Sequence, residues 1–190
     1  MIERHHWFAL LGLSLALAGC TSEPAPPRVV EKRVSEAPAS RGAGLLRATM
    51  LTAHNRARAE AGVPPLTWDE ALVDSAHAYA EELAKSRRFE HSAQLRGLNP
   101  EGKNLWTGTR GAYRYDEMIG HWVAEKAMFR RGPAPNFSST GKGGDVAHYT
   151  QIVWRTTERV GCSMAATARD DVLVCRYSPA GNVVGRDPFE

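Results

Sequence analysis

Apolar side chains recur every three or four residues in three stretches of the chain, and this spacing predicts three helices. The first runs from Leu45 to Gly62, where a glycine followed by two prolines is a stop signal. The second follows Thr67-Trp68-Asp69-Glu70, which has the form of a capping box, and runs to about Ser86. The third runs from Arg114 to Arg131.

Later in the chain, β-branched and aromatic residues replace the helical spacing and predict strands. His148–Trp154 is predicted as a strand with His148 at its end, beside the core and facing a cavity. Val160–Ala165 and Asp171–Tyr177, separated by a polar turn, predict an antiparallel hairpin. Residues 87–114, between the second and third helices, are predicted to form a long functional loop.

Glu125 interrupts the apolar face of the third predicted helix. The rest of that face consists of large apolar residues, namely Met118, Trp122 and Phe129. A carboxylate at a position where burial is expected needs a partner or a proton. Two interpretations stay open on this pattern: a salt bridge, for example to Arg58, or a polar pocket shared with His148.

The first 44 residues are predicted to lie outside the fold. Arg4 and the short apolar run Trp7–Ala18 are typical of a signal peptide and too short to span a bilayer. Leu17-Ala18-Gly19-Cys20 resembles a bacterial lipobox, in which Cys20 becomes the lipidated first residue; the alternative is an ordinary secretory signal that contains a cysteine. We therefore predict a signal peptide at 1–19, a disordered tether rich in Pro, Ala and Ser at 20–44, and one domain at 45–190.

Charge and cysteine content narrow the functional classes. The net charge is only +3 and the basic residues are scattered, so we predict no nucleic-acid partner. With Cys20 lipidated, Cys162 and Cys175 remain, and the predicted hairpin places them opposite one another. In an exported protein such a pair is expected to form a disulfide, which leaves neither cysteine available as a nucleophile.

Several of these segments, taken together, resemble the CAP superfamily of cysteine-rich secretory proteins, antigen 5 and plant pathogenesis-related proteins. The similar segments follow the family's usual order: His54-Asn55 with Arg58, Pro64–Asp69, His91-Ser92, His148–Trp154 and Val174–Asn182. The resemblance implies an α+β fold, a three-layer α-β-α sandwich with a central antiparallel sheet. It also implies a cleft lined by two histidines and two acidic residues, which binds zinc or another divalent ion in some members.

Carried over by motif, the cleft histidines are His91 and His148, and one acid is Glu125, which favours the pocket interpretation. The second acid is expected within Gly-Glu-Asn-Leu, where this chain has Gly102-Lys103-Asn104-Leu105. An ammonium in place of a carboxylate disfavours a bound dication, and Lys103 could instead pair with Glu125. We therefore predict a ligand cleft lined by His91, Lys103, Glu125 and His148, with no required cofactor and at most weak zinc binding through the two histidines.

The resulting functional prediction is a non-enzymatic binding module, attached to the cell envelope through lipid on Cys20. Its ligand is expected to be a lipid, a peptidoglycan fragment or a protein, and Thr21 after the lipidated cysteine favours the outer membrane. The alternative is a protease-like hydrolase in which His148 or His91 works with Glu125 as acid and base. The chain has no Gly-x-Ser-x-Gly and no His-Glu-x-x-His sequence, so binding is the preferred prediction.

Overall fold

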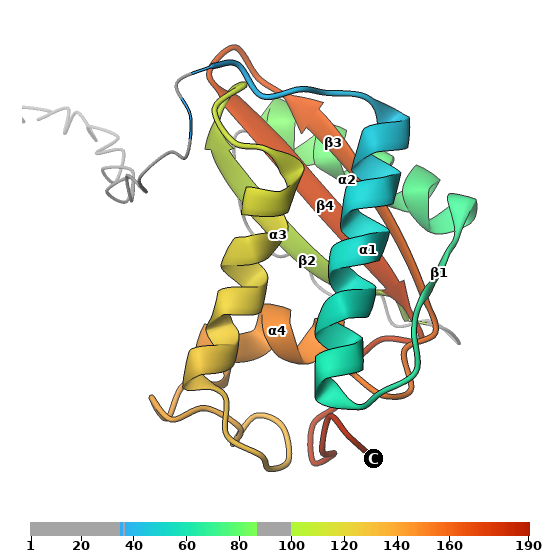
Figure 1. Ribbon diagram of the computed structural model, residues 1–190, viewed down its shortest axis with the longest axis vertical. Helices are drawn as coiled ribbons and strands as arrows, with labels where there is room; N and C mark the ends of the chain where they lie inside the picture. The colour runs from blue at the N-terminus through green and yellow to red at the C-terminus, as the bar shows by residue number, and fades with distance from the viewer. Residues whose placement is uncertain (1–34, 36, 87–99) are drawn as a thin grey trace, which may run out of the picture. The chain divides into compact units, whose positions relative to one another are not determined.

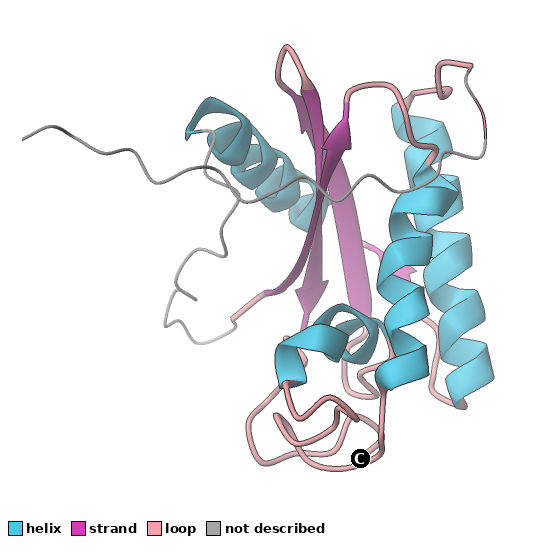
Figure 2. Cartoon of the chain, turned by 90° about the vertical axis from the view of Figure 1, so that its left-hand side faces the viewer, coloured by secondary structure: helices cyan, strands magenta, loops and turns pink. Residues whose placement is uncertain are grey.

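A four-stranded sheet lies between two layers of helices (Figures 1 and 2). The structure is a computed structural model, which describes residue 35, residues 37–86 and residues 100–190. The helices are α1 (Ala43–Ala61), α2 (Glu70–Ser86), α3 (Tyr115–Ala124) and α4 (Ala147–Ile152), with 3-10 turns η1 (Glu125–Met128) and η2 (Gly143–Val146). The strands are β1 (Thr67–Trp68), β2 (Gly102–Thr109), β3 (Arg159–Ala166) and β4 (Asp170–Ser178). None of the helices in this part of the chain combines the length and apolar composition that a bilayer span requires.

The strand order is β1-β3-β4-β2. Strand β4 pairs antiparallel with both β2 and β3, and the two-residue β1 joins β3 in parallel. Helix α2 covers one face of the sheet, whereas α1, α3 and α4 lie on the other. The predicted three-layer α-β-α sandwich is confirmed.

The alternation of side chains along β2 divides the core into two clusters. Leu105 packs with α2 residues, and the next residue, Trp106, packs with α1 and α3. Successive side chains of a strand point to opposite faces. Lys103 therefore lies on the same face as Leu105, and Asn104 lies on the same face as Trp106.

The predicted hairpin and disulfide are confirmed. Strands β3 and β4 pair antiparallel, with Cys162 directly opposite Cys175. The sulfur atoms are 2.00 Å apart and close a loop with a sequence separation of 13. In the chain-entropy model a loop of this length stabilises the fold by about 3 kcal/mol.

The prediction of a strand at His148–Trp154 is wrong, because this segment forms the short helix α4. Its β-branched and aromatic residues favour a strand in isolation. Tertiary contacts override that preference here. The side chain of Glu125 accepts hydrogen bonds at the first turn of α4, and the side chain of Arg58 donates hydrogen bonds at its last turn.

Two other element boundaries differ from the prediction. The third helix ends at Ala124, so Glu125 begins a 3-10 turn rather than continuing the helical face. Part of the predicted loop at 87–114 forms β2, whose two glycines and single large aliphatic residue gave no strand signal. Residues 87–99 lie outside the described part of the chain.

The second helix and the domain also begin at other residues than predicted. Asp69, not Thr67, caps α2, since its Oδ1 accepts from the backbone N–H groups of Ala71 and Leu72. Thr67 is instead in β1, paired with β3. The end of the predicted tether is part of the fold, because Arg41 Nη2 lies 2.6 Å from Oδ2 of the buried Asp171.

Arg58 of α1 is fully buried and binds backbone carbonyls instead of a carboxylate. Its Nη1 donates to the carbonyls of Ile152 (2.9 Å) and Trp154 (2.8 Å), and its Nη2 donates to that of Thr157 (2.9 Å). Burial lowers the pKa of Arg58 from 12.5 to about 10, which leaves it charged at neutral pH. The interpretation of Glu125 as a salt-bridge partner of Arg58 is therefore wrong.

We predict that Arg58→Met lowers the free energy of unfolding by at least about 3 kcal/mol, since several buried carbonyls lose their donor at once. Urea unfolding followed by circular dichroism measures the effect. The control is Arg56→Met on the exposed side of the same helix, for which we expect a change below about 0.5 kcal/mol. A loss at Arg58 as small as that at Arg56 would contradict the assigned role.

Candidate functional site

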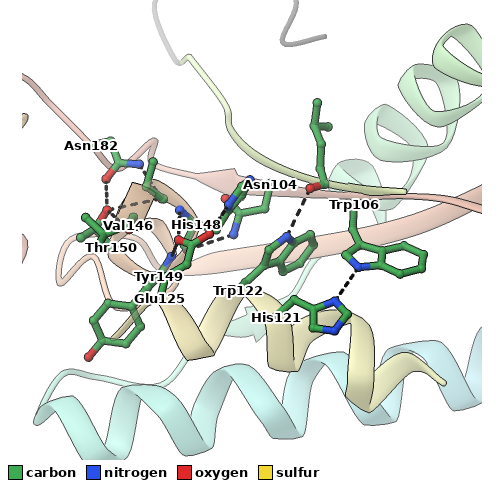
Figure 3. A network of polar contacts seen from close by, with 12 residues as sticks. Asn104, Trp106, His121, Trp122, Glu125, Val146, His148, Tyr149, Thr150 and Asn182 are labelled. Atoms are coloured by element: carbon green, nitrogen blue, oxygen red, sulfur yellow. Dashed lines mark hydrogen bonds and ion pairs between the residues drawn. The ribbon is translucent and has the colours of Figure 1, made fainter. Parts of the chain in front are cut away.

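Glu125 and His148 form a carboxylate–imidazole pair (Figure 3). His148 Nδ1 donates to Glu125 Oε1 at 2.6 Å. The second oxygen, Oε2, accepts from the backbone N–H groups of His148 (3.0 Å) and Tyr149 (3.1 Å). The start of η1 thus positions one carboxylate so that it both caps α4 and orients the imidazole.

The ring of His148 is held between Glu125 and an aromatic neighbour. The indole of Trp122 stacks on it at 5.8 Å between centroids, with 17° between the ring planes. A carboxylate accepts, so Nδ1 carries the proton, and in the neutral ring Nε2 has the lone pair. The His148 side chain is 25% exposed and that of Glu125 is 16% exposed, so the imidazole is the more accessible part of the pair.

A chain of buried hydrogen bonds connects the site to α1. His54 Nδ1 donates to the carbonyl of Met50 (2.7 Å), and its Nε2 accepts from the hydroxyl of Tyr177 (2.8 Å). The hydroxyl oxygen of Tyr177 accepts from Asn104 Nδ2 (3.0 Å), which also donates to the carbonyl of His148 (3.1 Å). The side chains of His54, Tyr177 and Asn104 thus form one continuous series of donors and acceptors.

Burial keeps this chain of groups uncharged. It lowers the pKa of His54 from 6.5 to about 4, and it raises the pKa of Tyr177 well above 10. At neutral pH both groups are therefore neutral, as the donor and acceptor pattern requires. The network holds the backbone of His148 through the hydrogen bond from Asn104 to its carbonyl, and it contains no buried charge.

Lys103 lies on the other side of the sheet from the Glu125–His148 pair. Its Nζ is 5.7 Å from the ring centroid of Tyr79 in α2, and it pairs in the sheet register with Arg176, whose guanidinium lies 4.7 Å from the same ring. Partial burial, with the nearby Arg176 charge, lowers the pKa of Lys103. The structure does not bring Lys103 to Glu125.

Of the residues predicted to line one cleft, the structure brings together Glu125 and His148. His91 lies outside the described residues. Within the described part of the chain, no cluster of three or more His, Cys, Asp or Glu side chains has the arrangement of a metal site. A tetrahedral zinc site needs three or four ligands, so the described residues do not by themselves fit one.

Sequence reasoning did not assign Asn104 or Tyr177 to the site. Both lie on strands, where the alternation of side chains shows only on which face of the sheet a residue lies. The signal that Asn104 carries is a polar residue within a strand that is otherwise buried. Tyr177 gives no such signal, because a tyrosine in a buried strand is common.

Because folding lowers the pKa of His54, the unfolded chain takes up a proton more readily between about pH 6.5 and pH 4. The contribution of His54 is complete above the unfolded pKa and is lost as the pH falls towards the folded pKa. We predict a loss of up to about 3 kcal/mol in the free energy of unfolding between pH 7 and pH 4 from this residue.

Urea unfolding at a series of pH values measures this loss. Carboxylates also titrate in part of the range, so the quantity of interest is the difference in slope between the native protein and His54→Gln, with exposed His77→Gln as the control. Equal slopes in the native protein and His54→Gln would show that His54 titrates normally.

Comparison with known proteins agrees with the fold and the arrangement of motifs. A family model described as the cysteine-rich secretory protein family, CAP, matches residues 51–177. Pathogenesis-related protein 1C from Nicotiana tabacum is 36% identical over 140 residues, which is 73% of this chain and 78% of the relative. Pathogenesis-related protein 1 from Arabidopsis thaliana is 35% identical over 140 residues, 73% of this chain and 80% of the relative.

Among solved structures, that of NaASP2 with Zn2+ superposes with a TM-score of 0.63 at 23% identity, over 82% of this chain and 89% of the other. This likeness supports the fold. The length of chain that the family model matches and the identity to the plant proteins show family membership as well as fold. The chain belongs to the CAP family.

Proposed function

We propose that this chain is a non-enzymatic binding module, which takes a ligand of the cell envelope at the Glu125–His148 site. The observation that carries the proposal is the bonding of Glu125. Both of its carboxylate oxygens already accept hydrogen bonds, two from backbone N–H groups and one from His148. A carboxylate used in this way orients a recognition group rather than acting as a mobile base.

The surroundings of His148 also favour binding. In the described part of the chain, the cysteine pair is a disulfide and supplies no thiol. The hydroxyl of Thr150 is directed to the carbonyl of Val146 and to Asn182 Oδ1, so it is part of the structure of α4. The partly exposed imidazole, held against the buried indole of Trp122, offers a fixed hydrogen-bonding group, which suits a ligand recognised at a defined polar contact.

We further propose that the protein is exported and attached to the envelope by lipid on Cys20, with residues 21–38 as the tether. The description of the matching family as secretory supports export. The lipobox-like Leu17–Cys20 sequence supports the anchor, and Thr21 favours the outer membrane. A lipid, a peptidoglycan fragment or another envelope protein is the ligand class that such an anchored site would meet.

A hydrolase is the alternative function. One observation favours it: the 2.6 Å contact between Glu125 and His148 Nδ1 is the arrangement that orients an imidazole as a general base. This reaction would use His148 or His91 with Glu125, and it would need water or a substrate group as the nucleophile.

Two measurements on one pair of variants distinguish these functions. Native mass spectrometry of protein purified from its own envelope should show a co-purifying ligand. In His148→Ala we expect the occupancy to fall at least about tenfold, because the ligand loses one hydrogen bond and the packing around it. His77→Ala, at an exposed histidine of α2, should retain the ligand.

Turnover of casein, aryl esters and peptidoglycan should be equal in the native protein and His148→Ala. Faster turnover by the native protein would replace the binding proposal by the hydrolase. Equal ligand occupancy in both proteins would place recognition elsewhere.

Zinc binding is proposed to be weak and dispensable. His148 is the one imidazole that the described residues offer at this site, and Glu125 is already committed to hydrogen bonds. Calorimetry with zinc should give a dissociation constant weaker than about 100 μM, as expected for an incomplete ligand set. His148→Ala should remove what binding remains.

The variant Lys103→Glu tests whether residue 103 lies near the zinc-binding position. Since Lys103 lies on the α2 face, we expect this substitution to change zinc affinity by less than about threefold, as for a charge remote from the ion. Tighter binding by a factor of ten or more would place residue 103 beside the ion.

A further inference from the structure

A cavity lies where β3 begins and β4 ends, under the loop of residues 179–184. Its volume is about 560 Å³, within the range of sites for small ligands. Residues that define it include Glu158, Arg159, Ser178, Pro179, Val183 and Val184. Neither Glu125 nor His148 is among its lining residues.

The loop over this cavity is fixed to α4. Gly181 N donates to Gln151 Oε1 (3.0 Å), and Asn182 Nδ2 donates to the carbonyl of Ala147 (2.9 Å). Asn182 Oδ1 in turn accepts from the hydroxyl of Thr150 at 2.7 Å (Figure 3). A Cβ at Gly181 would come within 2.8 Å of the Gln151 side chain, so only glycine allows this close approach. The cavity wall is therefore preorganised, which lowers the entropic cost of binding.

The charges at the cavity do not cancel. The guanidinium of Arg159 is already used, because Nη1 lies 2.7 Å from Asp69 Oδ2 and Nη2 donates to Ser178 Oγ (3.0 Å). The side chain of Glu158 is exposed and makes no ion pair or side-chain hydrogen bond to the described residues. One carboxylate without an ion pair thus lies among the lining residues, which favours a cation.

Part of the remaining lining is apolar and exposed. Val183 is 42% and Val184 is 80% exposed, and both are among the large hydrophobic residues that the described fold leaves in water. An aliphatic ligand surface placed on these valines and on Pro179 would remove apolar area from solvent. The same ligand would place its cation at Glu158.

We infer that this cavity binds a short peptide segment in which a lysine or arginine lies beside aliphatic residues. The long side chain of a basic residue matches a carboxylate at the edge of an apolar wall, since its methylene groups pack while its charge stays hydrated. This site is separate from the Glu125–His148 site and does not depend on the function proposed for that site.

The probe is the peptide acetyl-Val-Lys-Val-amide, titrated into the full chain and followed by amide chemical shifts in nuclear magnetic resonance. We expect shifts at Val183 and Val184, and affinity about three- to fivefold weaker in Glu158→Gln, the usual effect of an exposed ion pair. The matched control Glu82→Gln, an exposed carboxylate of α2, should bind as the native protein does. Val184→Ser should weaken binding by loss of the apolar contact.

Acetyl-Val-Glu-Val-amide and butylamine are the comparison ligands, and we expect both to bind more weakly than the lysine peptide. Equal binding of the glutamate peptide would overturn the charge assignment, and equal binding of butylamine would overturn the peptide assignment. Absence of any shift, or equal affinity in Glu158→Gln, would overturn the site itself. His148→Ala should leave peptide binding unchanged, so this result is independent of the outcome at His148.

Discussion

The arrangement of the site depends on how a six-residue helix is held at both ends. A helix as short as α4 is not stable alone, because nucleation costs more than so few hydrogen bonds return. Glu125 accepts from backbone N–H groups at its first turn, and Arg58 donates to carbonyls at its last turn. These charges have the signs that the helix dipole favours at each end. His148 lies in the first turn, so its imidazole is positioned by the same contacts that allow the helix to exist.

The groups that hold α4 come from distant parts of the chain. Arg58 belongs to α1 and Glu125 to η1, which follows α3, while Asn104 of β2 binds the carbonyl of His148. The loop after β4 adds Asn182, which binds the carbonyl of Ala147. The Glu125–His148 pair lies at the first turn of α4, and the loop of residues 179–184 that lines the cavity is hydrogen-bonded to α4. Unfolding of α4 would therefore affect both places, whereas truncation of the His148 side chain removes none of the hydrogen bonds that hold the loop.

The sheet separates two electrostatic environments. On the α2 face, Lys103 and Arg176 lie near the ring of Tyr79, whereas on the other face Glu125 orients His148. Lys103 replaces the glutamate of the expected Gly-Glu-Asn-Leu motif. The replacement therefore removes an acid, but the lysine does not lie against the imidazole of His148. The buried His54–Tyr177–Asn104 chain connects α1 to the same site in neutral form, so the backbone of His148 is fixed without the desolvation cost of a buried ion.

The residues alone determined the elements whose apolar spacing is regular, namely the three long helices and the β3–β4 hairpin with Cys162 opposite Cys175. They also indicated that Glu125 was an unusual carboxylate on an apolar face. The tertiary structure decided that His148–Trp154 is helical, that Arg58 binds carbonyls instead of Glu125, and that Lys103 faces α2. The reason is physical: local spacing reports which face of an element is apolar, whereas the conformation of a short segment and the partner of a buried charge depend on groups that only folding brings within hydrogen-bond distance.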